Sequence, residues 1–390
     1  MRKIAFFCIP AHGHTNPTLP VVRALTDMGH EVTYYSFPPF KEAVEATGAR
    51  FVSCDTGEVG KMASGGAVAR DIRVSTRLIA DTTLALQDMA LESLRALKPD
   101  VIVSDSVAFW GKLFAAKLGI PYVCSTTTFA FNKYSSRIMK QGLGDLLGML
   151  IKMPLAGREL KPLRQAGYPV KNVLDIVSND NDTPTVVYTS KAFQPFGETF
   201  SDKYAFVGPC LRAPEAAMAK PERPLVYVSM GTVLDGEEDF YRNCVQAFGD
   251  GKYEIMLSVG ESRPPTDLPE NIHVHRRVDQ IAVLGVADAF ITHCGMNSVS
   301  EALYFGVPLV MRPLTPEEGG VASRVGELGA GLRLDDPSPA AIRAAVDAAL
   351  ADPGYRNAAK DIGRGFRQCG GAKEAASFIL SVASGSDDRP

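Results

Sequence analysis

Residues 290–310 combine side chains that can hold both a phosphate and a sugar. Apolar runs flank a polar turn in this segment, which predicts a strand, a helix and a second strand. A helix start presents unpaired N–H groups and a partial positive charge, so it can bind a phosphate. The turn supplies four residues for such a seat: His293, Gly295, Asn297 and Ser298. Glu301 follows one turn into the helix, where its carboxylate can accept hydrogen bonds from a ribose diol.

Glu301 also fits a purely structural role. The spacing from Ser298 to Glu301 matches a capping box, in which both side chains bond backbone N–H groups at a helix start. A carboxylate used in this way is occupied by its own helix. The residues alone leave both roles for Glu301 open.

His14 and Asp105, far apart in the sequence, are predicted to meet. Residues 4–9 indicate a buried strand that leads toward His14, and residues 101–104 indicate one that leads into Asp105. In a doubly wound sheet of order 3-2-1-4-5, strands 1 and 4 are neighbours, and ligands bind beyond their carboxyl ends. A carboxylate beside an imidazole fixes the tautomer of the ring, so this pair can act as a general base.

Structural roles remain open here too. His14 could cap the helix after Pro17, and Asp105 could cap the helix after its own strand. His12 lies nearer to the strand, so we assign it a structural role. Trp110 could line a binding pocket or belong to the core.

The same strand rule applies to the second half of the chain. A strand over residues 225–229 leads into Gly231 and Thr232, and the strand before His293 should lie beside it. Thr232 is therefore expected near His293 and the helix start at Asn297, so that two backbone-rich turns surround one phosphate site.

Apolar runs alternate with helical patterns in both halves, which predicts an α/β protein with two parallel, doubly wound sheets. The expected strands cover residues 4–9, 31–35, 50–53, 101–104, 122–125 and 185–188, then 225–229, 254–259, 272–275, 289–292 and 308–311. Prolines between residues 208 and 224 indicate a linker. We predict domains at 1–210 and 225–360, a linker at 211–224, and C-terminal helices at 361–390 that pack on the first domain.

Composition narrows the range of partners. The chain has 390 residues and a net charge of −3, without a dense basic block, which argues against nucleic acid or an anionic membrane. Its seven cysteines form no C-x-x-C pair, so no zinc site or disulfide framework is indicated. No apolar run has the length of a membrane span. We expect a cytoplasmic protein, monomeric or homodimeric, without a metal.

Several motifs together resemble the family-1 nucleotide-sugar glycosyltransferases of the GT-B fold, particularly the bacterial macrolide and flavonoid group. The matching segments are P-A-H-G-H-T-N-P at 10–17, P-D-V-I-V-S-D at 99–105, S-M-G-T at 229–232, H-C-G-M-N-S-V-S-E-A-L at 293–303 and G-G-A-K-E-A-A at 370–376. The likeness spans nearly the whole chain. It implies two Rossmann-like domains that face each other across a cleft.

The resemblance implies a role for each matching position. His14 would be the catalytic base and Asp105 its partner, while Glu301 would bind the ribose of a UDP-sugar. Positions that would hold the donor's diphosphate are Thr232, His293, Gly295, Met296, Asn297 and Ser298. The loop with Val278 and Gln280 would lie beside the uracil ring.

Two departures from the family pattern concern the donor. Arg277 stands where an aromatic residue usually stacks on the base, and a guanidinium can stack as well. Glu317 and Glu318 stand where Asp-Gln usually grips the sugar hydroxyls. Glu318 can only accept hydrogen bonds and would repel a uronic acid, which favours glucose as the sugar.

The expected reaction is an inverting transfer without a metal or cofactor, in which UDP-sugar is a co-substrate. The acceptor would be a small lipophilic or phenolic molecule, bound by residues 57–84 and 129–150. Two other functions stay open: a UDP-sugar epimerase that uses Glu317 and Glu318, and a silent nucleotide-sugar-binding subunit. The short acidic motifs at 180–182 and 235–239 are assigned to solvated segments.

Overall fold

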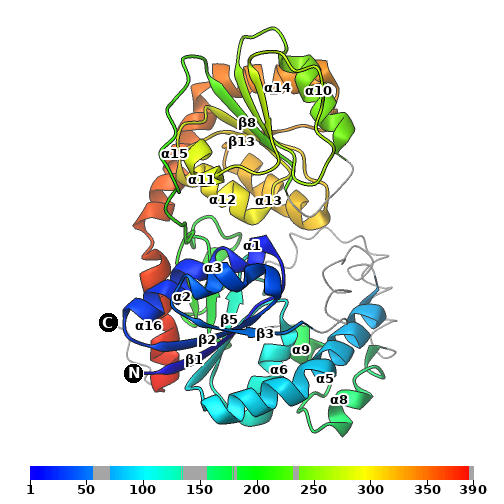
Figure 1. Cartoon of the computed structure of the whole chain (residues 1–390), viewed down its shortest axis with the longest axis vertical. Coiled ribbons are helices and arrows are strands. Elements are labelled where there is room, and N and C mark those ends of the chain that lie inside the picture. The colour runs from blue at the N-terminus through cyan, green and yellow to red at the C-terminus, as the bar shows by residue number, and fades with distance from the viewer. Residues whose placement is uncertain are drawn as a thin grey trace. The chain divides into compact units, whose positions relative to one another are not determined.

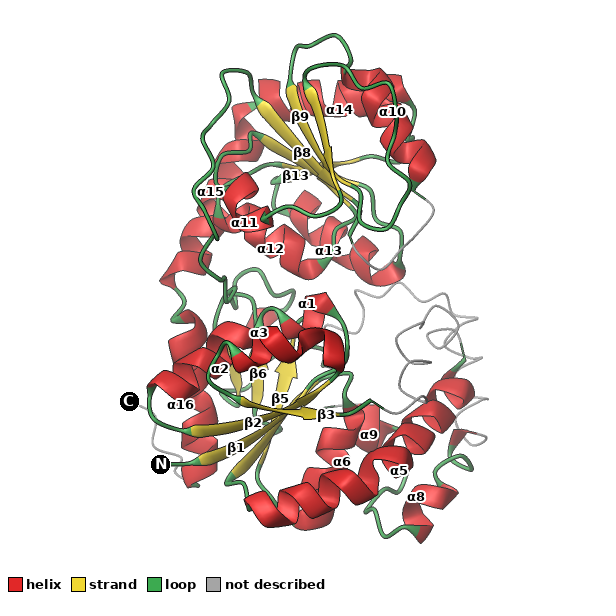
Figure 2. Cartoon of the chain, in the orientation of Figure 1, coloured by secondary structure: helices red, strands yellow, loops and turns green. Residues whose placement is uncertain are grey.

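The computed structural model describes residues 1–55, 71–132, 134, 156–177, 179, 182–231 and 237–385. The chain forms two compact units, residues 1–210 with 370–390, and residues 211–369. In each unit, helices flank a parallel sheet (Figures 1 and 2). The predicted α/β class with two doubly wound sheets is confirmed.

The sheet of the first unit has the order β3-β2-β1-β4-β5-β6-β7, and all pairs are parallel. Its strands are β1 (Lys3–Phe7), β2 (Glu31–Ser36), β3 (Arg50–Ser53), β4 (Val101–Asp105), β5 (Tyr122–Thr126), β6 (Thr185–Val187) and β7 (Tyr204–Phe206). The expected order holds from β3 to β5. The three-residue β7 was not predicted, because so short a strand carries little periodic signal.

Strand β1 shows why both faces of this sheet are covered. Its side chains alternate: Ile4 and Phe6 pack in one hydrophobic cluster, and Ala5 and Phe7 pack in another. The first cluster contains residues of α2, α3 and α16, and the second contains residues of α5, α6, α8 and α9. The helices are α1 (His12–Thr15), α2 (Thr18–Asp27), α3 (Lys41–Glu45), α5 (Ile72–Leu97), α6 (Phe109–Leu118), α8 (Lys161–Gln165), α9 (Leu174–Val177) and α16 (Gly371–Ser384), with short 3₁₀ turns at Pro38–Phe40 and Gly197–Thr199.

The second unit repeats the arrangement with the order β10-β9-β8-β11-β12-β13. Its strands are β8 (Leu225–Ser229), β9 (Glu254–Ser258), β10 (Ile272–His275), β11 (Ala289–Thr292), β12 (Leu309–Met311) and β13 (Gly331–Arg333). Its helices are α10 (Glu238–Phe248), α11 (Gln280–Leu284), α12 (Met296–Tyr304), α13 (Pro316–Glu327), α14 (Pro339–Ala351) and α15 (Pro353–Gln368). Five of these strands were predicted; β13, another three-residue strand, was not.

The C-terminal segment divides between the units later than the sequence prediction places it. Helix α15 packs against α12 in the second unit, whereas α16 packs against α2 in the first. Gly363 of α15 lies so close to α12 that an added Cβ would be 2.2 Å from the Leu303 carbonyl oxygen. This close approach ties α15 to the second unit, so the boundary falls between Cys369 and Gly370 rather than at residue 361.

The predicted linker at 211–224 belongs to the second unit as well. Arg212 forms an ion pair with Asp279 at 2.6 Å, and Lys220 pairs with Asp288 at 2.8 Å. These contacts explain why a proline-rich segment is held against the unit it leads into.

Candidate active site

His14 and Asp105 meet at the carboxyl ends of the neighbouring strands β1 and β4. Nδ1 of His14 lies 2.7 Å from Oδ2 of Asp105, and the Asp105 side chain is fully buried. The His14 side chain keeps 20% of its exposure, so a substrate can reach the ring. With Nδ1–H donating to the carboxylate, Nε2 on the opposite side of the ring is the nitrogen that can take a proton.

The capping roles considered for this pair are not formed. The N-cap residue of helix α2 is Pro17, and that of α6 is Ala108. Neither helix start has a side-chain cap. The second carboxylate oxygen of Asp105 accepts the Val107 N–H at 2.9 Å. Both oxygens of Asp105 are therefore engaged, one by the local turn and one by His14.

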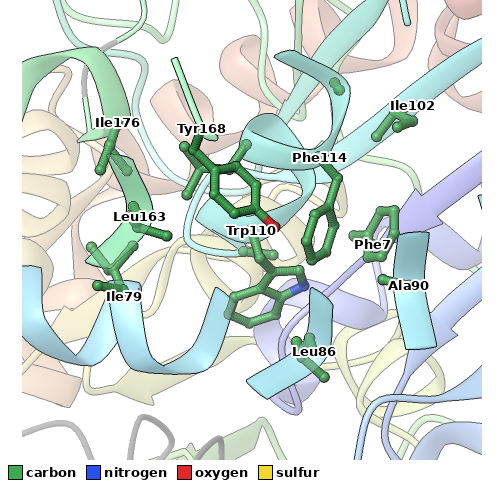
Figure 3. Close-up of a cluster of buried hydrophobic side chains, with 14 of the residues drawn as sticks. Phe7, Ile79, Leu86, Ala90, Ile102, Trp110, Phe114, Leu163, Tyr168 and Ile176 are labelled. Atoms are coloured by element: carbon green, nitrogen blue, oxygen red, sulfur yellow. The ribbon is translucent and has the colours of Figure 1, made fainter. Parts of the chain in front are cut away.

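Two aromatic residues near the pair have structural positions. The His12 ring packs edge-on against Phe40, with centroids 5.0 Å apart, as expected for a structural histidine. Trp110 is fully buried, and Figure 3 shows it among the core side chains around Phe114 and Tyr168. Trp110 is thus a core residue.

Thr127 is a third member of the site that the sequence analysis missed. Its Oγ1 lies 3.2 Å from Nδ1 of His14. Thr127 directly follows β5, which pairs with β4, so its strand ends at the same edge of the sheet as Asp105. The rule that located Asp105 could have found Thr127, had it been extended to the next strand.

The thiols of Cys8 and Cys124 lie near Asp105, and its charge affects their pKa values. Burial, followed by the nearby Asp105 carboxylate, raises the pKa of the Cys124 thiol to about 12, and the same two causes raise the pKa of Cys8. Both thiols therefore stay protonated at neutral pH. The Asp105 carboxylate accepts hydrogen bonds from His14 and from the Val107 N–H.

His293 occupies a slot between two glycines in the second unit. A Cβ at Gly231, after β8, would lie 2.7 Å from Cε1 of the ring, and one at Gly295 would lie 2.7 Å from Nε2. Only glycine leaves room for the imidazole at these positions. The predicted neighbour Thr232 lies outside the described residues, as do residues 235 and 236 of the acidic run.

The conformation of the turn at Cys294 determines where helix α12 begins. Cys294 adopts a left-handed conformation with φ of 73°, and its N–H donates to Oγ1 of Thr292 at 3.2 Å. Helix α12 then begins at Met296 with Gly295 as its flanking residue, and no side chain caps it. Gly295 carries no side chain that could cap the first N–H groups, and a helix start of this kind can bind a phosphate. The Met296 side chain is buried, so a bound sugar nucleotide could contact only the backbone of this residue.

Glu301 does not form the capping box considered above. Instead, one carboxylate oxygen accepts a hydrogen bond from Nε2 of Gln280, which also donates to Oγ of Ser298 at 3.2 Å. Tyr227 OH donates to the amide oxygen of Gln280 at 3.1 Å. Burial raises the pKa of Glu301 to about 7, and the Gln280 bond opposes this rise. Glu301, the residue predicted to bind the ribose, and Gln280, the residue predicted to lie beside the base, are therefore joined by a hydrogen bond.

Glu318 has a role that the sequence analysis did not assign to it. Its Oε2 accepts the N–H groups of Leu314 and Thr315 at 2.7 and 2.9 Å, and the Thr315 hydroxyl accepts the Glu318 N–H. This is a complete capping box at the start of α13. Oε2 is therefore occupied by backbone, whereas Oε1 is not part of the capping box, and the expected contact of Glu318 with sugar hydroxyls stays a prediction.

The remaining predicted donor residues lie on neighbouring loops of the second unit. Arg277 is exposed and Val278 partly buried, in the turn between β10 and α11. Glu317 is exposed in the first turn of α13. Asn297 is partly buried at the start of α12. These residues follow the carboxyl ends of β10, β11 and β12, the edge of the sheet where the fold rule expects a ligand.

Two features are absent from the described residues. These residues contain no group of three or more His, Cys, Asp or Glu side chains placed to hold a metal ion. They also contain no helix that is long and apolar enough to cross a membrane.

Comparisons with known proteins agree with this architecture. Residues 212–364 match the family described as "UDP-glucoronosyl and UDP-glucosyl transferase". The chain is 34% identical to the NDP-glycosyltransferase YjiC of Bacillus licheniformis over 97% of both chains. It is 32% identical to the demethyllactenocin mycarosyltransferase of Streptomyces fradiae, over 98% of this chain and 87% of the other.

A solved structure supports the same assignment. The glycotransferase of kitacinnamycin matches with a TM-score of 0.83 and 28% identity, covering 98% of this chain and 99% of the other. The chain therefore belongs to the family-1 nucleotide-sugar glycosyltransferases and is a glycosyltransferase of the GT-B fold.

Proposed function

We propose that the protein transfers a hexose from a UDP-sugar to a hydroxyl group of a small lipophilic or phenolic natural product, with inversion at the anomeric carbon. The single observation that carries the proposal is the buried His14–Asp105 pair at 2.7 Å. Nε2 of His14 takes the acceptor's hydroxyl proton while the acceptor oxygen bonds to the anomeric carbon. The bond from that carbon to the diphosphate breaks, and UDP leaves with the electron pair.

The second unit supplies the donor site in this proposal. The N–H groups at the start of α12 and the His293 ring meet the charge that develops on the leaving diphosphate. Glu301 accepts from the ribose hydroxyls, and Gln280 and Val278 lie beside the base with Arg277 stacked on it. This charge compensation by the chain itself supports a reaction that needs no metal ion.

Glucose is the proposed sugar. Two relatives with 29% and 31% identity carry the name "Uncharacterized UDP-glucosyltransferase". Glu317, exposed at the start of α13, is the side chain proposed to accept from the sugar hydroxyls. A negatively charged residue at this position disfavours a uronic acid donor.

A lipophilic acceptor is supported by exposed apolar side chains in the first unit. The expected acceptor stretches, 57–84 and 129–150, lie partly outside the described residues. Their described parts expose Val74, Phe131 and Tyr134. Relatives include an oleandomycin glycosyltransferase from Streptomyces antibioticus, which is 28% identical. The seven cysteines, which all lie in the described part of the chain, form no disulfide, which is in keeping with the proposed cytoplasmic location.

The test is a transfer assay with UDP-glucose and dTDP-glucose across a panel of phenols and macrolides, with products identified by mass and the anomeric configuration by NMR. The wild-type chain should form a β-glucoside from α-linked donor. The variant His14→Ala should lose transfer yet bind UDP as wild type does. Full activity in that variant, or an epimerised sugar nucleotide formed without acceptor, would contradict the proposal.

A further inference from the structure

The pair His293 and Glu318 has no assigned joint role, although it lies beside the proposed diphosphate seat. Nε2 of His293 lies 4.0 Å from Oε1 of Glu318, and the two side chains retain only 15% and 13% of their exposure. Oε1 is the oxygen that the capping box leaves over, because Oε2 accepts the N–H groups of Leu314 and Thr315. The box thus holds a carboxylate oxygen at a fixed place, facing the imidazole.

The position of the ring is fixed from its other sides. Gly231 and Gly295 bracket it so closely that a Cβ at either would overlap it. Since the slot and the capping box both restrict movement, the approach of His293 to Glu318 is built into the unit and does not depend on a flexible surface side chain.

Few charged groups compete for His293 in the part of the chain that the structure describes. Glu318 of α13 is the charged group that raises the pKa of His293. The Ser229 backbone carbonyl, at the end of β8, raises this pKa by a smaller amount. Cys294, next in sequence, is a thiol kept neutral because burial raises its pKa. Glu301 of α12 is bonded to Gln280. Burial lowers the pKa of His293, and Glu318 is the main force against this.

We propose that Glu318 is a positioning residue for the leaving group: it keeps His293 protonated when the donor's diphosphate binds, so that an imidazolium is held between the carboxylate and a phosphate oxygen. This inference rests on the proposed function, because it concerns the same donor site. Binding of a nucleoside diphosphate should then take up a proton, and Glu318 should set the pH range in which this occurs.

The experiment is isothermal titration of UDP and of dTDP into the full chain across about pH 5 to 8, in buffers of different ionisation enthalpy. The wild-type chain should take up protons on binding, and affinity should fall as the pH rises. In Glu318→Gln, whose amide oxygen can still accept the two N–H groups, proton uptake near neutral pH should fall. The midpoint of the affinity profile should move down by about one pH unit.

Two controls separate this effect from other causes. Thr315→Ala removes the hydroxyl that accepts the Glu318 N–H but keeps both backbone N–H groups that hold Oε2 and changes no charge, so it should lower thermal stability and leave proton uptake as in wild type. Titration with uridine, which lacks phosphates, reports protons taken up by Glu301 alone.

The outcomes distinguish the inference from the proposed function. Equal proton uptake by wild type and Glu318→Gln would overturn the inference, and so would a Glu318→Gln defect confined to UDP-glucose with UDP binding unchanged. The latter pattern would instead make Glu318 a sugar contact. If neither nucleotide binds the wild-type chain at all, the proposed function itself fails.

Discussion

Glu301 is bonded to Gln280, a residue of another helix, and not to the N–H groups of its own helix. This cross-link between α11 and α12 holds a carboxylate beside the helix start that faces the proposed diphosphate. The Glu301 carboxylate is also buried, and burial raises its pKa to about 7, so ionising it in the folded protein costs free energy. The proposed ribose site is therefore predicted to reduce the stability of the unliganded unit.

The first prediction concerns Glu301→Gln. A carboxyl whose folded pKa is raised binds its proton more tightly in the folded state, so the cost of ionising it is absent below its ordinary pKa of about 4.5 and complete above about 7. The variant should unfold with a free energy higher by up to about 3 kcal/mol at pH 8, with little change at pH 4. Denaturant melts at the two pH values measure this, and equal differences at both would contradict it.

The same variant should bind the donor less well. The amide oxygen introduced at this position can still accept from Gln280, but a neutral amide accepts more weakly from the ribose diol than a carboxylate does. UDP affinity should fall by about tenfold, whereas inorganic pyrophosphate, which has no ribose, should bind as it does to wild type. Loss of affinity for both probes would indicate damage to the phosphate seat instead.

The second prediction concerns Asp105→Asn. The amide would disturb the Nδ1–H tautomer of His14 and would no longer stabilise the imidazolium, although the hydrogen bond to the Val107 N–H can persist. Turnover should fall by on the order of 10³-fold, with nearly unchanged KM for UDP-glucose. Steady-state kinetics measure this, and a loss below about tenfold would remove Asp105 from proton transfer.

The third prediction concerns Thr127, whose Oγ1 lies 3.2 Å from Nδ1 of His14. Thr127→Val keeps the side-chain shape but removes a polar contact that helps to orient the ring, so turnover should fall by about five- to tenfold. Thr127→Ser should restore most of it. Equal activity of the Val and Ser variants with wild type would show that the hydroxyl has no part in orienting His14.

How much of this could be predicted from the sequence depends on the type of signal. The contact between His14 and Asp105 could be predicted, because apolar runs mark β1 and β4 and parallel topology places their ends together. Thr127 needed the further pairing of β4 with β5. These long-range contacts follow from strand order, which periodicity indicates well.

Capping was harder to predict, because spacing alone is ambiguous. Residues 298–301 and 315–318 both match the capping pattern, and only the second forms the box. The left-handed Cys294 starts α12 at Met296, so Ser298 is already inside the helix and cannot cap it. That backbone angle belongs to the folded turn before α12, and the spacing of polar residues in the sequence does not report it.

The fourth prediction tests the His293 slot through its glycines. In Gly295→Ala the new Cβ would meet Nε2 of His293 at 2.7 Å, so the ring must move away from the proposed diphosphate seat. UDP affinity should fall by about tenfold or more, and stability should fall by about 1–3 kcal/mol, the usual cost of overpacking.

Gly319→Ala, in α13 of the same unit with nothing within 4 Å, is the matched control. It should leave UDP affinity unchanged and raise stability by about 0.5–1 kcal/mol, because alanine favours a helix interior over glycine. Similar losses of UDP affinity in both variants would show that the position of His293 does not control binding.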